Sequence, residues 1–86
     1  MKMIIVIVQD NDADTLTQAF TAGSFRVTRI ASTGGFLRRG VVTMLLGVDE
    51  DKVDDAFQVV RNALPSMESK SRATLFVVPV NRFERI

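Results

Sequence analysis

Apolar residues recur along this chain in short runs that alternate with stretches of helical spacing. Three of the runs are continuous, rich in β-branched side chains and typical of buried strands: Met3–Val8, Val41–Val48 and Ala73–Val80. A fourth segment, Phe25–Thr33, alternates less regularly and predicts a strand with a bulge or twist. The pattern therefore predicts four strands, with Pro79 at a strand end or sheet edge.

Two stretches between these strands have the spacing of amphipathic helices. The first is expected to begin at Asp12 or Asp14 as N-cap and to end at Gly23 in the left-handed conformation. The second is expected to be capped by Asp49 and stopped by Pro65. The apolar stripes of the two are Ala13, Leu16, Ala19 and Phe20, and Val53, Ala56, Phe57, Val60, Ala63 and Leu64.

The resulting order of strand, helix, strand, strand, helix, strand predicts an α+β fold. It is the ferredoxin-like βαββαβ arrangement, a single four-stranded antiparallel sheet in one domain spanning residues 1–86. Right-handed crossovers place both helices on one face of the sheet. Three of the strands are apolar on both faces, so one apolar face is left uncovered, and we expect self-association through it.

Composition narrows the chemistry. Among the 86 residues, 47% are hydrophobic and 24% charged, and the net charge of +1 gives no reason to expect a nucleic-acid polymer as partner. The sequence has no His, Cys, Tyr or Trp, so the commonest general base, the thiolate nucleophile and the usual transition-metal ligands are missing. The remaining side chains suit anion binding better than catalysis, and we expect neither an enzyme nor a cofactor.

Two further features of the sequence bear on where in the cell the protein is expected. The longest apolar run, Met3–Val8, is too short to span a bilayer, and no small-residue cleavage site precedes or follows it. The lack of cysteine fits a reducing compartment. We expect a cytoplasmic protein without membrane insertion.

The densest candidate site is the loop Thr33–Gly40. Its paired glycines, Gly34 and Gly35, allow several backbone N–H groups to converge on an anion, and Phe36 offers a plane for a base. A plain hairpin connection, with arginines for solubility, explains the same residues.

A second candidate lies on the strand that leads into this loop. Arg26 and Thr28 are two residues apart and face the same side, where a guanidinium and a hydroxyl suit a phosphate. A solvated strand face is the alternative explanation.

Other interpretations are less favoured. The acidic stretch that begins at Asp49 fits a helix N-terminus better than a divalent-cation site, because EF-hand spacing is absent. An RNA-recognition module needs aromatic residues on its third strand, and the segment Arg39–Met44 has none. A P-loop is absent, and the first loop, Gln9–Asp12, lacks the Arg of an acylphosphatase.

Two motifs together resemble a known family. Thr-Gly-Gly-Phe-Leu-Arg at Thr33–Arg38 follows Phe-Arg-x-Thr at Phe25–Thr28, and the segments Met1–Asp10 and Ala73–Val80 also match. In these residues the chain resembles the cyclic-di-AMP receptor-like proteins, which are PII-like signal transduction proteins. The resemblance implies a homotrimer that binds cyclic-di-AMP, or a related adenine nucleotide, in clefts between subunits and acts on an unknown downstream protein.

The resemblance also implies a set of ligand-contacting positions. They match Arg26, Thr28, Gly35, Phe36, Leu37, Gly47 and Phe76, to which the loop glycine Gly34 is added. In this assignment Arg26 and Thr28 take phosphate, and Phe36 lies against an adenine.

The chain departs from the family pattern at several positions. Ser24 and Val41 stand where family members usually carry Asn, and Arg85 stands where they carry Gln. The long connection before the last strand is reduced to Pro65–Arg72. Two alternatives therefore stay open: a PII-like trimer for another adenine nucleotide or small anion, and a structural interaction module without a small-molecule ligand.

Overall fold

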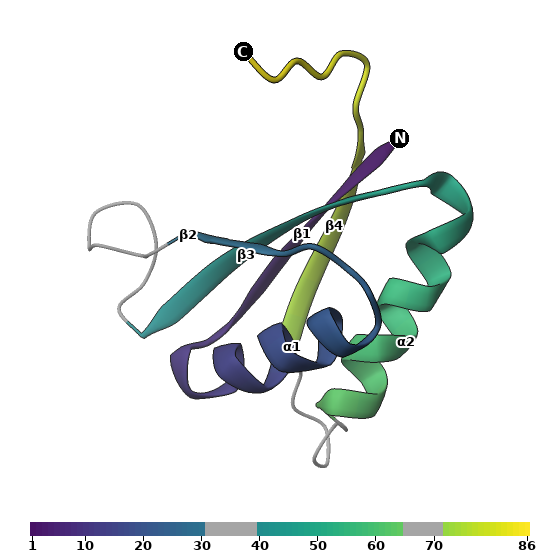
Figure 1. Ribbon diagram of the computed structural model, residues 1–86. Coiled ribbons are helices and arrows are strands. Elements are labelled where there is room, and N and C mark those ends of the chain that lie inside the picture. Colours follow the sequence, from purple (N-terminus) through teal and green to yellow (C-terminus); the bar gives the residue numbers. More distant parts are fainter. Residues whose placement is uncertain (31–39, 65–71) are drawn as a thin grey trace.

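The computed structural model describes residues 1–30, 40–64 and 72–86 (Figure 1). Within these residues the elements follow the predicted order. They are β1 (Lys2–Gln9), α1 (Asp10–Ala22), β2 (Thr28–Ile30), β3 (Val41–Val48), the 3₁₀ turn η1 (Glu50–Lys52), α2 (Val53–Ala63) and β4 (Ala73–Pro79).

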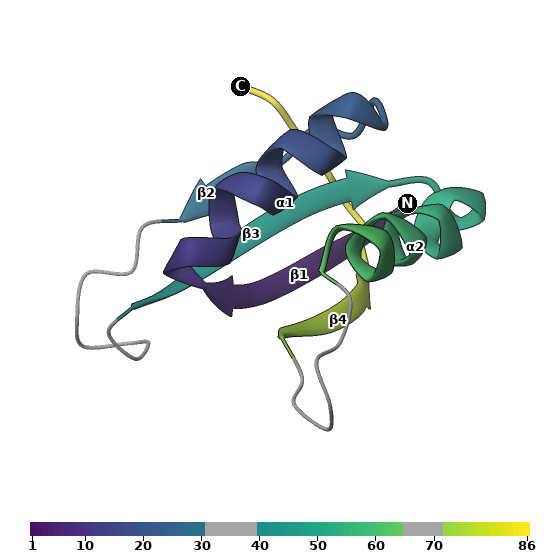
Figure 2. The ribbon, with the colours of Figure 1, turned by 90° about the horizontal axis from the view of Figure 1, so that it is seen from below.

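The four strands form one sheet in the order β2-β3-β1-β4, and all neighbouring strands are antiparallel. Both helices lie on one face of it: Figure 1 shows them below the sheet, and Figure 2 shows them from below, lying over it. The predicted ferredoxin-like α+β fold is confirmed. Pro79 ends β4, an edge strand, as expected for a residue without a backbone donor.

The second strand starts later than predicted. Among the described residues its pairing covers Thr28–Ile30, so the expected strand over Phe25–Thr33 was wrong at its start; Ala31, Ser32 and Thr33 lie outside the described residues. The reason lies in the chain direction before Thr28. There the backbone is still completing the C-terminal cap of α1 and has not yet met β3.

The predicted start of α1 was also wrong. The helix begins directly after β1, with Gln9 as N-cap and no side-chain cap bond, and so neither Asp12 nor Asp14 caps it. Asp12 instead faces inward, where its carboxylate accepts a hydrogen bond of 2.8 Å from Arg72 Nη2. This tertiary contact outweighs the local capping preference of Asp.

The second helical segment follows the prediction more closely. Asp49 stands at the N-cap of η1 in extended conformation, although its side chain makes no cap bond. The first turn is 3₁₀ and the α-helix proper follows. It ends at Ala63, before Pro65, as predicted.

The core lies between the helices and the sheet. Alternate residues of β1 and β3 point toward the helices and are buried, as the period of two in a strand requires. They are Ile4, Val6, Val8, Val42, Met44, Leu46 and Val48, and they pack with Leu16, Phe20, Ala56, Val60 and Leu64.

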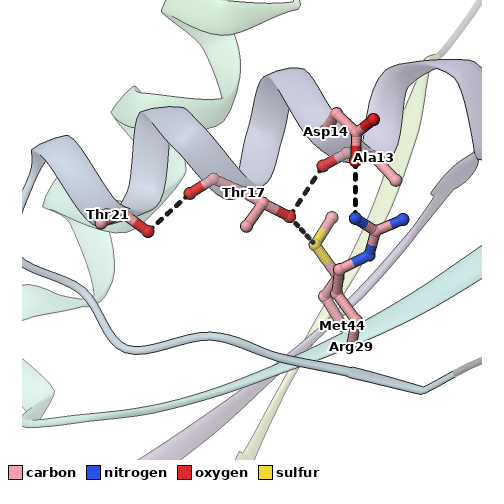
Figure 3. Close-up of polar contacts among 6 residues, drawn as sticks. All are labelled: Ala13, Asp14, Thr17, Thr21, Arg29 and Met44. Atoms are coloured by element: carbon pink, nitrogen blue, oxygen red, sulfur yellow. Dashed lines mark hydrogen bonds and ion pairs between the residues drawn. The ribbon is translucent and has the colours of Figure 1, made fainter.

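Polar contacts attach α1 to the β2–β3 side of the sheet (Figure 3). Arg29 Nη1 donates to Asp14 Oδ1 at 2.7 Å. Thr17 Oγ1 donates to Met44 Sδ at 3.6 Å and, within the helix, to the backbone oxygen of Ala13 at 2.8 Å. The contacts with Arg29 and Met44 join α1 to β2 and β3.

The other face of the sheet is largely apolar. Paired residues of antiparallel strands share a face, so Thr28, Leu45, Ile5 and Phe76 form one row across all four strands. Phe76 is 52% exposed. No element among the described residues covers this face, which we call the open face (Figure 1).

Candidate functional site

The candidate site begins at the C-terminus of α1. The N–H of Ser24 donates to Thr21 O at 3.0 Å, and the N–H of Phe25 donates to Phe20 O at 2.8 Å. These two bonds form a Schellman motif, in which the residue after the C-cap adopts the left-handed conformation. That residue is Ser24, with φ of 68°.

The left-handed residue was therefore predicted one position too early. Gly23 is the C-cap, and its φ of −85° is open to any residue, so this position does not require a glycine. The packing of Phe25 explains the shift, since its ring meets that of Phe20 edge to face, with 6.1 Å between centroids. A Schellman motif brings these two positions together only when Ser24 is the left-handed residue.

This cap determines where Arg26 lies. Phe25 and Val27 on either side pack against the core, whereas Arg26 and Thr28 are exposed. The Arg26 side chain makes no ion pair or hydrogen bond with any of the described residues. Its half-buried neighbours anchor the backbone here, and the guanidinium lies exposed at the surface.

The structure brings Arg26 close to Gly47, another predicted site residue. Arg26 precedes the paired part of β2, and it lines the same surface hollow as Gly47 near the end of β3. A Cβ at Gly47 would meet nothing within 4 Å, so the space next to this glycine is open.

Both residues line one surface hollow of about 580 Å³. Three segments meet there: the end of α1, the end of β3 and the start of α2. The lining residues are Gly23, Ser24, Phe25, Arg26, Gly47, Val48, Asp49, Lys52, Asp55 and Val59. The size falls in the range of small-molecule sites, and the lining combines an apolar floor with a charged rim.

Sequence reasoning missed the α2 side of this hollow. Asp55 was covered only by the interpretation of a helix N-terminus, and Lys52 was not singled out. Both line the hollow and form an ion pair, with Lys52 Nζ 3.9 Å from Asp55 Oδ2. Their spacing along the chain shows that they share a helix face. Only the packing of α2 against α1 brings this face to the border of the hollow that Arg26 lines.

Two of the remaining predicted residues, Thr28 and Phe76, do not line the hollow. Thr28 and Phe76 lie on the open face, on the two edge strands, about three strand spacings or 14 Å apart. Gly34, Gly35, Phe36 and Leu37 lie outside the described residues.

Two absences apply to the parts of the chain that the structure describes. No helix there is long and apolar enough to cross a membrane. No group of three or more carboxylates gathers there that could hold a metal ion.

A solved structure has the same fold over nearly the whole chain. It is the crystal structure of a functionally unknown protein from Pediococcus pentosaceus, 33% identical in sequence, with a TM-score of 0.82. The match covers 99% of this chain and 96% of that one. The family model described as cyclic-di-AMP receptor matches residues 1–70. Arg26, Gly47 and the strands β1, β2 and β3 lie within this match, whereas β4 lies beyond it. The chain belongs to the cyclic-di-AMP receptor family.

Proposed function

We propose that this protein is a cytoplasmic, homotrimeric, PII-like signalling protein that binds cyclic-di-AMP in clefts between its subunits. The observation that carries the proposal is the hollow beside Arg26 and Gly47, in a chain of the cyclic-di-AMP receptor family. Ligand-dependent movement of the loop that contains Gly34, Gly35, Phe36 and Leu37 would carry the signal to an unknown downstream protein.

Arg26 is the central residue of the proposed site. A planar guanidinium binds a phosphate through two parallel hydrogen bonds, and Arg26 has no competing partner among the described residues. The Schellman motif and the half-buried ring of Phe25 fix its backbone, so little backbone entropy is lost when a ligand binds.

The positions of Thr28 and Phe76 support a site between subunits. They belong to opposite edges of one sheet, too far apart to contact one base or one phosphate from a single chain. A neighbouring subunit that brings its β4 edge beside β2 would bring the two side chains together. Self-association through the apolar open face would supply that neighbour.

Binding without catalysis is part of the proposal. The sequence contains no His and no Cys. The hollow offers Arg26, Lys52 and two carboxylates, which form no nucleophile and base pair of the kind that acyl or phosphoryl transfer enzymes use.

A second candidate ligand is another adenine nucleotide, such as ATP or cyclic AMP. Ser24 lines the hollow, and its hydroxyl is shorter than the Asn side chain usual in the family and offers fewer hydrogen bonds. A site that makes fewer contacts with one ligand discriminates less against related ones.

Calorimetric titration of cyclic-di-AMP, ATP and cyclic AMP tests the proposal. We expect cyclic-di-AMP to bind, and Arg26→Ala to weaken it at least about tenfold, since a hydrogen bond to a charged group contributes about 1.5–3 kcal/mol. Arg61→Ala serves as the control, because Arg61 is exposed on α2 and does not line the hollow. Absence of binding at millimolar concentration, or equal affinity of wild type and Arg26→Ala, would contradict the proposal.

A further inference from the structure

A second cationic side chain, that of Lys52, lines the hollow. Lys52 ends η1 and lines the hollow from the α2 side, whereas Arg26 lines it from the α1 side. These are the only two cations among the lining residues of the described chain. The family resemblance assigns no role to Lys52.

The present partner of Lys52 holds it only weakly. Its Nζ lies 3.9 Å from Asp55 Oδ2, and the two side chains are 58% and 66% exposed. Exposed ion pairs of this length contribute little to stability. The flexible four-carbon stem of lysine allows the ammonium group to exchange this carboxylate for another anion at small cost.

A cyclic dinucleotide offers a second anionic group that a second cation can bind. It carries two phosphodiester groups, each with one negative charge, and Arg26 can hold one of them. The other would lie in a hollow that also contains Asp49 and Asp55, where like charges repel. An ammonium that turns from Asp55 to the phosphate removes this repulsion and adds a charge-assisted hydrogen bond.

From this arrangement we propose that Lys52 binds the second phosphate of a cyclic dinucleotide and that Asp55 competes with that phosphate for its ammonium. The inference rests on the proposed function and assigns the two phosphates of one ligand to opposite walls of the same hollow. Ligand binding then exchanges the Lys52–Asp55 pair for a Lys52–phosphate pair.

The test compares Lys52→Gln with Lys2→Gln. Lys2 Nζ also lies 3.9 Å from a carboxylate, that of Glu50, but Lys2 does not line the hollow. We expect Lys52→Gln to weaken cyclic-di-AMP binding about tenfold and to change cyclic AMP binding less than twofold, because cyclic AMP has one phosphate for Arg26. Lys2→Gln should leave both affinities within twofold of wild type.

Asp55→Asn gives a change of opposite sign. It frees Lys52 and removes a negative charge from the rim, so cyclic-di-AMP should bind several-fold more tightly. The gain should be clearly smaller in the Lys52→Gln background, where only the reduced repulsion remains. The salt dependence of cyclic-di-AMP affinity should also be shallower in Lys52→Gln, since one fewer ionic contact is formed. Thermal melts of each variant show that it is folded.

The outcomes separate this inference from the proposed function. If wild type binds cyclic-di-AMP and Arg26→Ala weakens it, but Lys52→Gln keeps wild-type affinity, the role of Lys52 is wrong and the proposed function stands. Equal losses for cyclic-di-AMP and cyclic AMP in Lys52→Gln, or weaker binding by Asp55→Asn, also overturn it. If wild type binds no cyclic-di-AMP, the proposed function fails first and the inference with it.

Discussion

At the scale of single residues, Ser24 is where local preference and tertiary structure conflict. It is the only non-glycine residue with positive φ among the described residues. The left-handed conformation costs an L-residue with a Cβ about 1–2 kcal/mol. The adjacent Gly23 could adopt a positive φ without this cost, but its φ is −85°.

Ser24→Gly is predicted to raise the free energy of unfolding by about 0.5–1 kcal/mol. The substitution removes the Cβ clash in the left-handed conformation, and part of that gain is offset by the larger backbone entropy of glycine in the unfolded chain. Urea unfolding followed by circular dichroism measures the change.

Ser24→Ala is the matched control for this prediction. It also loses the hydroxyl but keeps the Cβ, so we expect no stabilisation. Equal stability of the Gly and Ala variants would show that the φ of Ser24 carries no strain.

At the scale of elements, ion pairs attach α1 to the sheet at both edges, and their burial differs. Asp12 pairs with Arg72, just before β4, at 2.8 Å, with side chains 13% and 31% exposed. Asp14 pairs with Arg29 of β2 at 2.7 Å, but the Asp14 side chain is 84% exposed. Although the two distances are nearly equal, the Asp14–Arg29 pair is expected to stabilise the fold less than the Asp12–Arg72 pair, because water screens it.

Asp12→Asn is predicted to lower the free energy of unfolding by about 1–2 kcal/mol, since it removes the charge of the nearly buried Asp12 carboxylate from its hydrogen bond with the half-buried Arg72. Asp14→Asn, the control, should cost at most a few tenths of a kcal/mol. Urea unfolding of both variants gives the comparison. Losses of equal size would mean that burial does not decide the strength of these pairs.

Most of the elements could be predicted from the sequence, because their local pattern and their packing agree. β3 has the predicted bounds, Val41–Val48, since an apolar run on both faces suits a central strand. The exception is β2, whose start depends on where the chain leaves the α1 cap and meets β3. That point is set by contacts between residues far apart in sequence, which propensity does not contain.

At the scale of the whole molecule, the main feature is the open face of the sheet, which none of the described elements covers. Its central row joins Leu45 and Ile5 to Phe76, and helices cover only the opposite side. A domain of 86 residues buries a modest share of its surface, so further burial through association adds substantially to stability.

Ile5→Lys is predicted to convert a trimer into monomers. Ile5 lies mid-row, and a charge buried in an apolar interface is costly unless it is paired. Light scattering at micromolar concentration should give the mass of three chains for wild type and of one for Ile5→Lys. The melting temperature should rise with protein concentration for wild type only.

Gln58→Lys, an exposed change on α2, is the control for this prediction and should remain trimeric. A stable, well-folded wild-type monomer would rule out the trimer. It would also remove the proposed neighbour that brings Phe76 to Thr28.

The candidate site could be predicted only in part. Arg26 and Gly47 follow from the family motif, and the structure brings them into one hollow. Lys52 and Asp55 could not be found in this way, because a charged helix start is the usual surface pattern and has no local mark of a ligand. Thr28 and Phe76 lie outside that hollow, on opposite edges of the sheet.

The sequence by itself determined the order of elements, the fold class and the family, because these depend on hydrophobic period and on motifs that are contiguous along the chain. Only the tertiary structure decided which residues meet. The left-handed residue is Ser24 and not Gly23, because this arrangement lets the Phe25 ring pack against Phe20. Lys52 came to border the Arg26 hollow because α2 packs against α1, which joins residues far apart in sequence that a local pattern does not encode. The Phe20–Phe25 contact spans only five residues, but it depends on how the end of α1 packs on the core, which helical spacing alone did not show.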